Sequence, residues 1–142
     1  MSHSTLLLLA VFPQVALTFG LLFWLGPARV AAVRRGEVRI KDIALGQSAW
    51  PDRITQISRS FQNQFELPVL FYVLVGLVLV THKADVWLAA GAWLFVLSRL
   101  LHAFVHVTSN SIQMRFQAYV VGAGVLVLMW LWLALRLMIE GA

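Results

Sequence analysis

The segment "RSFQNQFELPVLFYVLVGLVLV", residues 59–80, carries an arginine, an asparagine and a glutamate directly into an unbroken apolar run. Such a run is typical of a membrane-spanning helix, in which a charged side chain at mid-bilayer costs about 2.5–3.5 kcal/mol. Arg59, Asn63 and Glu66 follow one another at helical spacing, so the sequence predicts that they share one helical face. Because such a face avoids lipid, we expect it to turn toward the protein interior.

The composition of the whole chain indicates a membrane protein. Of its 142 residues, 61% are hydrophobic and 12% are charged, which leaves too little polar surface for a soluble all-α domain. Four apolar segments, with their polar extensions, are long enough to cross a hydrocarbon core of about 30 Å. We therefore predict an all-α integral membrane fold, a four-transmembrane-helix bundle forming one domain over residues 1–142. The apolar segments are 6–25, 67–80 with a polar lead-in from 59, 86–107 and 118–135.

The net charge of +5 is unevenly distributed, because most of the basic residues lie in segment 29–59. By the positive-inside rule this segment is cytoplasmic, and both termini and the turn at 81–85 then face the opposite side. Contact with lipid phosphates accounts for the positive charge, so membrane lipids and no nucleic acid are the expected partners.

The chain has no cysteine, which excludes disulfides, thiolate metal ligands and a cysteine nucleophile. Its four histidines form no H-E-x-x-H pattern, and the sequence has no glycine-rich phosphate loop. We therefore predict no metal site. Any sulfur chemistry has to come with a substrate.

Two later segments carry polar side chains to the same membrane depth as residues 59–66. Arg99, His102 and His106 are spaced to share one helical face. Arg115 and Tyr119, four residues apart, open the last apolar segment at the same cytoplasmic end. We expect these faces to converge in one polar site.

The polar residues alone allow three explanations. In a structural network, Glu66 would neutralise Arg59 or Arg99, and Asn63 would bridge helices. Snorkelling to the interface would explain Arg59 and Arg115 but not the shorter, deeper Asn63 and Glu66. In the third explanation, the excess of cations beside one carboxylate, an amide and two imidazoles binds an anionic, zwitterionic ligand. Glutathione fits this description, and so do a phospholipid headgroup and a nucleotide.

Four short motifs resemble one known family, the membrane-associated proteins in eicosanoid and glutathione metabolism (MAPEG). The family includes microsomal glutathione transferases and prostaglandin E synthase, and the resemblance covers nearly the whole chain. The most specific motif is R-x-x-x-N-x-x-E at 59–66, followed closely by Pro68. The other motifs are "GEVR" at 36–39, "RLLH" at 99–102 and "RFQAY" at 115–119.

The resemblance implies a homotrimer in which each glutathione site lies between neighbouring subunits and opens to lipid. Small residues at 89–92, 118 and 122–124 would allow the close helix approach that such packing needs. Arg115 is then the stabiliser of the glutathione thiolate, and Arg39 is the candidate for a glutathione carboxylate. The other implied site residues are Tyr119 and His106 for catalysis, and Arg59, Asn63, Glu66, Arg99 and His102 for glutathione binding.

The chain also departs from the prostaglandin synthase pattern. His106 stands where that type has a tyrosine, Gln62 replaces an arginine, and Phe116 replaces a serine. These departures argue against the prostaglandin reaction and indicate a shortened, prokaryote-like member in a bacterial inner membrane.

The resemblance predicts a glutathione-dependent membrane transferase or peroxidase, with a hydrophobic electrophile or a lipid hydroperoxide as its second substrate. A second hypothesis is a non-catalytic lipid- or partner-binding protein, since the family contains a member that binds a fatty acid without turnover. A third is a proton or ion pathway through Glu66 and His102.

The charge distribution makes a testable prediction about orientation. A phosphatase fused to the C-terminus should be active and a fluorescent protein fused there should be dark. The reason is that the basic segment 29–59 holds its end of the bundle in the cytoplasm, which leaves the C-terminus on the opposite side. Paired phosphatase and fluorescent-protein fusions measure this. Activity of the C-terminal fusion only in the cytoplasm would contradict the prediction.

Overall fold

The computed structural model describes residues 1–44 and 49–140, which form helices and no strand. Four helical spans in this part of the chain are long and apolar enough to cross a membrane, which confirms the predicted all-α membrane fold. The second span consists of three consecutive elements. The elements are α1 (His3–Arg34), η1 (Ile40–Asp42), α2 (Asp52–Gln62), η2 (Asn63–Phe65), α3 (Leu67–Val80), α4 (Val86–Val107) and α5 (Ile112–Glu140), of which η1 and η2 are 3₁₀ turns.

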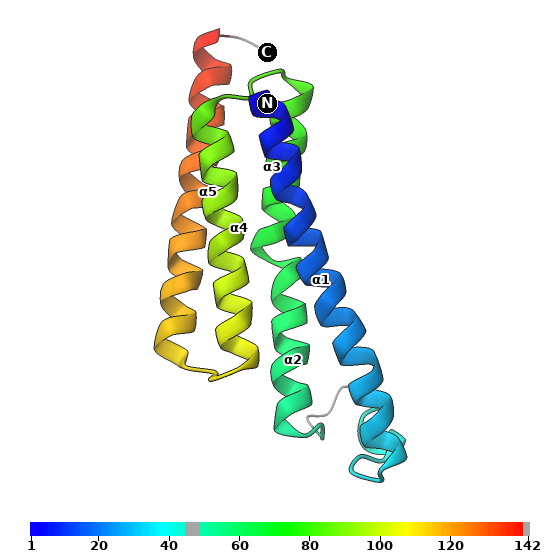
Figure 1. Ribbon diagram of the computed structural model, residues 1–142. Coiled ribbons are helices and arrows are strands. Elements are labelled where there is room, and N and C mark those ends of the chain that lie inside the picture. The colour runs from blue at the N-terminus through cyan, green and yellow to red at the C-terminus, as the bar shows by residue number, and fades with distance from the viewer. Residues whose placement is uncertain (45–48, 141–142) are drawn as a thin grey trace.

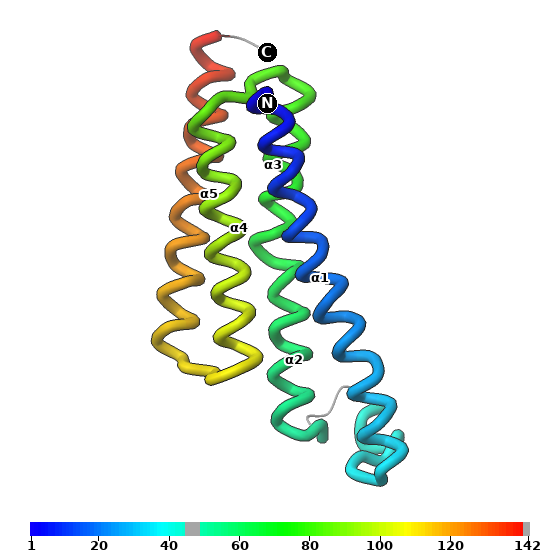
Figure 2. Tube along the Cα trace, viewed as in Figure 1, coloured from blue at the N-terminus to red at the C-terminus, as the bar shows by residue number. Residues whose placement is uncertain are grey.

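The spans run alternately up and down the bundle (Figures 1 and 2). The N-terminus, the 81–85 turn and the end of α5 lie at one end, and the α4–α5 turn faces the other. At that other end, α1 and α2 continue beyond the α4–α5 turn, and the basic segment after α1 lies at the tip (Figure 1). The predicted orientation requires the N-terminus, the 81–85 turn and the end of α5 to lie at the same end of the bundle.

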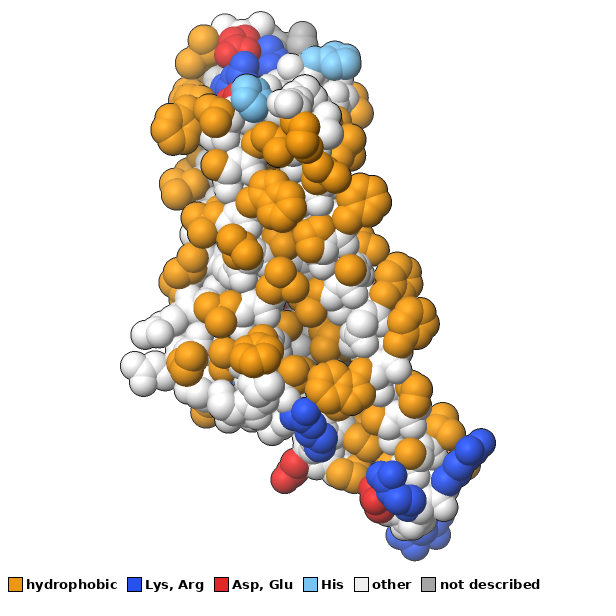
Figure 3. Space-filling model, viewed as in Figure 1, with side chains coloured by type: hydrophobic (Ala, Val, Ile, Leu, Met, Phe, Trp, Pro, Cys, Tyr) orange, Lys and Arg blue, Asp and Glu red, His pale blue; other side chains and the backbone are white. Residues whose placement is uncertain are grey.

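The outer surface of the bundle is apolar along most of its length. Figure 3 shows hydrophobic side chains covering the middle of the molecule, with Lys, Arg, Asp and Glu gathered at the two ends. Large side chains such as Phe12, Phe23 and Leu128 are exposed on this surface. Lipid rather than water satisfies such a surface, so the protein is an integral, multi-pass membrane protein.

The first span ends just before a glycine. Gly36 has a φ of 73°, a left-handed conformation that glycine adopts without steric cost. Its N–H donates to the carbonyl of Val33, and the N–H of Glu37 donates to the carbonyl of Ala32. This pair of bonds closes the helix and turns the chain toward η1.

The second span differs from the continuous helix that the sequence predicts. Helix α2 stops at Gln62, η2 follows, and Glu66 has non-helical backbone angles before α3 begins. The physical reason is Pro68 in the first turn of α3, because proline lacks an N–H and its ring disfavours a helix on its N-terminal side. The prediction that Arg59, Asn63 and Glu66 share one helical face is therefore wrong at Glu66.

The core consists of two apolar clusters at different depths. One cluster includes Leu7, Phe71 and Phe95, the last two being stacked with ring centroids 4.8 Å apart. The other includes Leu21 of α1 and Ile57 of α2. Along α1, the buried residues of the first cluster end at Ala10 and those of the second begin at Leu21. The buried glutamine Gln14 lies between them.

Two glycines bring α4 and α5 of one chain close together. A Cβ on Gly91 would lie 2.8 Å from Cγ of Met129, and one on Gly122 would lie 2.4 Å from Oγ of Ser98. Gly124 has nothing within 4 Å of the corresponding position, so within this chain it makes no close approach.

Asp85 joins the 81–85 turn to helices α4 and α5. Its carboxylate accepts hydrogen bonds from the N–H of Leu88 at 2.8 Å, from Nε1 of Trp132 at 2.7 Å and from Nη1 of Arg136 at 2.9 Å. One carboxylate thus caps the N-terminus of α4 and holds the last turns of α5 against it.

Replacing Asp85 with alanine should lower the free energy of unfolding by about 2 kcal/mol, since a helix cap and two side-chain bonds are lost together. Thermal unfolding in detergent measures this. Asp42→Ala is the control, because its ion pair with Arg39 is exposed and should contribute little. Equal effects of the two substitutions would contradict the role of Asp85.

Candidate functional site

A hollow of about 390 Å³ opens between the end of α2, η2, the C-terminal half of α4 and the first turns of α5. It contains most of the predicted site residues from all three polar segments. The lining residues are Arg59, Gln62, Asn63, His102, His106, Ile112, Arg115, Phe116 and Tyr119.

His102 lies at the centre of the site and connects its three walls. Its Nδ1 is 2.8 Å from the carbonyl oxygen of Arg115, and its Nε2 is 3.2 Å from Nδ2 of Asn63. Because a carbonyl only accepts, Nδ1 carries the hydrogen, and Nε2 accepts from the Asn63 amide. The ring also lies beside His106 and Tyr119, at centroid distances of 5.8 and 5.9 Å.

Arg115 is held at the start of α5 by a residue that the sequence analysis did not identify. Its Nη1 donates to Oδ1 of Asn110 at 2.8 Å. Asn110 has a φ of 50°, and asparagine is among the few residues that adopt this conformation readily. The only sequence signal for this support was the polar turn "TSNS" at 108–111.

Arg99 is fully buried beside the hollow, at 0% exposure. Its guanidinium carbon lies 5.4 Å from the ring centroid of Tyr119. None of its three guanidinium nitrogens has a hydrogen-bond partner among the described residues. A buried cation in this condition is energetically costly.

The structural network that the sequence allowed is formed only in part, because Asn63 bridges η2 and α4 through His102 but Glu66 does not take the predicted place. Glu66 makes no ion pair with Arg59 or Arg99 among the described residues. It is exposed at the break between η2 and α3 and does not line the hollow. Among the described residues, no carboxylate therefore forms an ion pair with Arg59, Arg99 or Arg115.

Arg39 lies apart from the other predicted site residues. It is exposed in the segment after α1, where its Nε donates to Oδ2 of Asp42 at 2.7 Å. The segment around it lies at the tip of the molecule, beyond the α4–α5 turn (Figure 1). A single chain thus brings Arg59, Asn63, His102 and the α5 residues together but leaves Arg39 out.

The close approach of α4 and α5 at Gly122 helps to position Arg99. A Cβ at this glycine would meet not only Ser98 but also Cδ of Arg99, at 3.6 Å. A side chain at position 122 would displace the hydroxyl of Ser98, the neighbour of Arg99, and would come into van der Waals contact with Arg99 itself. Gly122 is thus a supporting residue of the site.

The fold and the site together define a class, that of integral membrane proteins with a polar, cationic site between their helices. The model of one family, the MAPEG family, matches residues 7–135, nearly the whole chain. The chain belongs to this family and is a membrane protein of the eicosanoid and glutathione group. No curated protein and no solved structure matches the chain significantly.

The unpaired guanidinium of Arg99 makes a testable prediction. Arg99→Met should stabilise the ligand-free protein by about 1–4 kcal/mol, because a buried charge is replaced by an apolar chain of similar length. The same change should weaken the binding of an anionic ligand. Arg59→Met at the exposed rim should leave stability unchanged.

Thermal unfolding in detergent without and with glutathione measures both effects. A loss of stability in the ligand-free Arg99→Met protein would contradict this account, since it would show that the charge has a partner within the folded protein.

Proposed function

We propose that the protein is a glutathione-dependent membrane enzyme, a transferase or peroxidase acting on hydrophobic electrophiles or lipid hydroperoxides. The observation that carries the proposal is the hollow in which Arg115, His102 and Asn63 meet beside the unpaired Arg99. Family membership supports the choice of glutathione among the anionic ligands that the charges allow.

Glutathione matches the side chains that are available. Its two carboxylates suit the guanidinium groups of Arg59 and Arg99, and its peptide groups suit the amide of Asn63. Its ammonium group needs an acid, and Glu66 is exposed within the span that carries Asn63. The tripeptide would supply the negative charge that the site lacks.

The proposed assembly is a homotrimer with a site between neighbouring subunits. Two observations support it: the site residues of one chain leave Arg39 out, and the polar residues Arg59, Gln62 and Glu66 are exposed at membrane depth. A neighbouring subunit would cover those residues and could bring its own Arg39 to the ligand.

In the proposed mechanism Arg115 stabilises the glutathione thiolate. Its guanidinium lies at the start of α5, where the positive end of the helix dipole acts in the same direction, and Asn110 fixes its position. The thiolate sulfur forms a bond to the electrophilic atom, and the leaving group departs with its electron pair. His106, whose Nδ1 has no partner among the described residues, and Tyr119 are the candidate groups for moving a proton.

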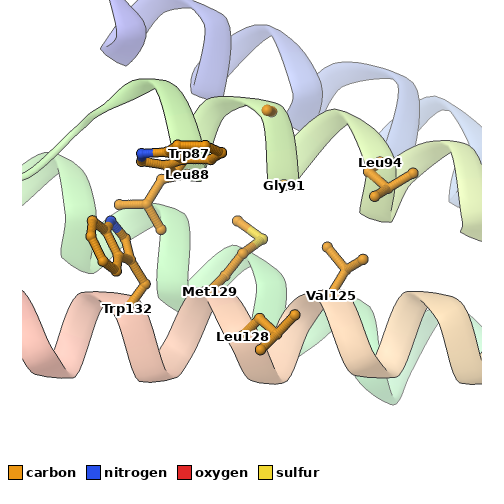
Figure 4. Close-up of a pocket in the computed structure, with 9 residues that line it drawn as sticks. Trp87, Leu88, Gly91, Leu94, Val125, Leu128, Met129 and Trp132 are labelled. Atoms are coloured by element: carbon orange, nitrogen blue, oxygen red, sulfur yellow. The ribbon is translucent and has the colours of Figure 1, made fainter.

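A second candidate function is lipid binding without turnover. It is favoured by a hollow of about 610 Å³ between α4 and α5, lined almost entirely by apolar side chains. Figure 4 shows Trp87 and Trp132 at one end of it and Met129 reaching from α5 toward α4 near Gly91. This hollow contains none of the polar site residues, so a lipid there would not need glutathione.

Arg115→Leu tests the proposed function. The substitution should reduce the thiolate signal of bound glutathione about tenfold, equivalent to about 1.4 kcal/mol, because free thiols titrate near pH 8.5 and need a cation to ionise at neutral pH. Binding itself should largely persist, since Asn63 and the other arginines still hold the peptide. Ultraviolet difference absorbance reports the thiolate directly.

Arg59→Leu is the matched control, because it removes a cation of the same hollow that would bind a carboxylate rather than the sulfur. It should weaken binding but preserve the thiolate signal at saturating glutathione. Equal thiolate signals from the wild-type protein and Arg115→Leu would show that Arg115 does not activate the thiol. Failure of the wild-type protein to bind glutathione at all would favour the lipid-binding function.

A further inference from the structure

Two glutamines pair in the interior of the bundle, between the apolar clusters. Gln14 of α1 is 0% exposed and Gln64 of η2 is 2% exposed. Nε2 of Gln14 donates to Oε1 of Gln64 at 2.8 Å, and Nε2 of Gln64 donates to the carbonyl of Ser60 at 2.9 Å. Neither glutamine lines the hollow, and neither has a role in the mechanism above.

Burial of two amides in a lipid-embedded bundle is unfavourable compared with two leucines, since every polar atom then needs a partner. The pairing here is incomplete, because Oε1 of Gln14 and Oγ of Ser60 have no partner among the described residues. Stability alone therefore does not account for the pair.

The position of Gln64 supplies another reason. In a continuous α-helix the carbonyl of Ser60 accepts from the backbone N–H of residue 64. Where the chain tightens into the 3₁₀ turn η2, hydrogen bonds shift to the residue three positions away. The side chain of Gln64 satisfies the Ser60 carbonyl at this point, and Gln14 anchors that side chain to α1.

Adjacent residues of η2 thus bond to different helices and have different roles. Gln64 is fixed to α1, while the side chain of its neighbour Asn63 reaches His102 in the hollow. Glu66 follows immediately at the break before α3. The orientation of η2 about its own axis determines where both Asn63 and Glu66 lie.

We infer that Gln14 and Gln64 are positioning residues of the glutathione site, in which α1 holds η2 so that Asn63 donates to His102. The identity of the ligand in this inference rests on the proposed function. The role of the pair in holding η2 does not depend on it. It assigns α1, which contributes no residue to the lining of the hollow, a role in binding.

The experiment has one readout that needs no ligand. Histidine-selective ¹⁵N NMR of the purified protein reports whether Nε2 of His102 accepts a hydrogen bond. The chain has only four histidines, and His102→Asn assigns the signal. In the double variant Gln14→Met/Gln64→Met the Nε2 resonance should move toward that of an imidazole nitrogen without a donor.

The second readout is the equilibrium affinity for glutathione. It should fall about tenfold in the same variant, because a displaced η2 would lose one hydrogen bond to the ligand. Its unfolding temperature should fall only modestly, because the Gln14–Gln64 bond loses both of its partners together and only the Ser60 carbonyl is left without its donor. Gln113→Met, on the exposed face of α5, is the matched control and should change neither readout.

An unchanged Nε2 resonance in a stable double variant would overturn the inference, whatever happens to glutathione binding. If the wild-type protein does not bind glutathione, the proposed function fails, while the NMR readout still decides the role of the pair. Gln14→Asn, which retains the amide but shortens its reach, serves if the double variant does not fold. It should shift the same resonance, and an unchanged signal would again overturn the inference.

Discussion

The two hydrogen bonds of the His102 ring tie the parts of this site together. They connect α4 to η2 through Asn63 and to α5 through the carbonyl of Arg115. His102 is only 4% exposed, so little water can replace a lost partner, and each bond restricts how the three elements can sit relative to one another. The hollow, the direction of the Asn63 amide and the place of Arg115 at the start of α5 all depend on this arrangement.

Arg99 is the exception that gives the site its chemical character. Its charge is buried beneath Tyr119, close to the Gly122 contact between α4 and α5, and the described residues offer it no hydrogen bond. Asn63 and His102 have hydrogen-bond partners within the chain, whereas the guanidinium of Arg99 has none among the described residues. The site therefore has a positive electrostatic potential. An anionic ligand that binds there recovers the cost of burying the charge, which is why the proposed function centres on a peptide thiol with two carboxylates.

The sequence predicted the parts of the molecule that follow from periodicity and hydropathy. The four spans and the convergence of His102, His106 and Arg115 needed only helical spacing and apolar length. The break at Glu66 was missed because Pro68 was interpreted as part of a motif rather than as a limit on the helix before it. The Gln14–Gln64 pair was missed because a contact between residues fifty positions apart has no local signal. Arg39 was predicted from a motif, and a motif match identifies a position in the sequence. It does not show that the residue lies at the site within its own chain, and Arg39 lies away from the hollow.

The central claim, that the buried polar groups form a glutathione site, is tested most directly by isothermal titration calorimetry of the wild-type protein in lipid nanodiscs. Glutathione should be compared with its N-acetylated form, which has no ammonium group for Glu66 to pair with. The account predicts saturable binding of glutathione and clearly weaker binding of the acetylated peptide. The absence of saturable heat with glutathione, or equal affinity for the two peptides, would contradict it.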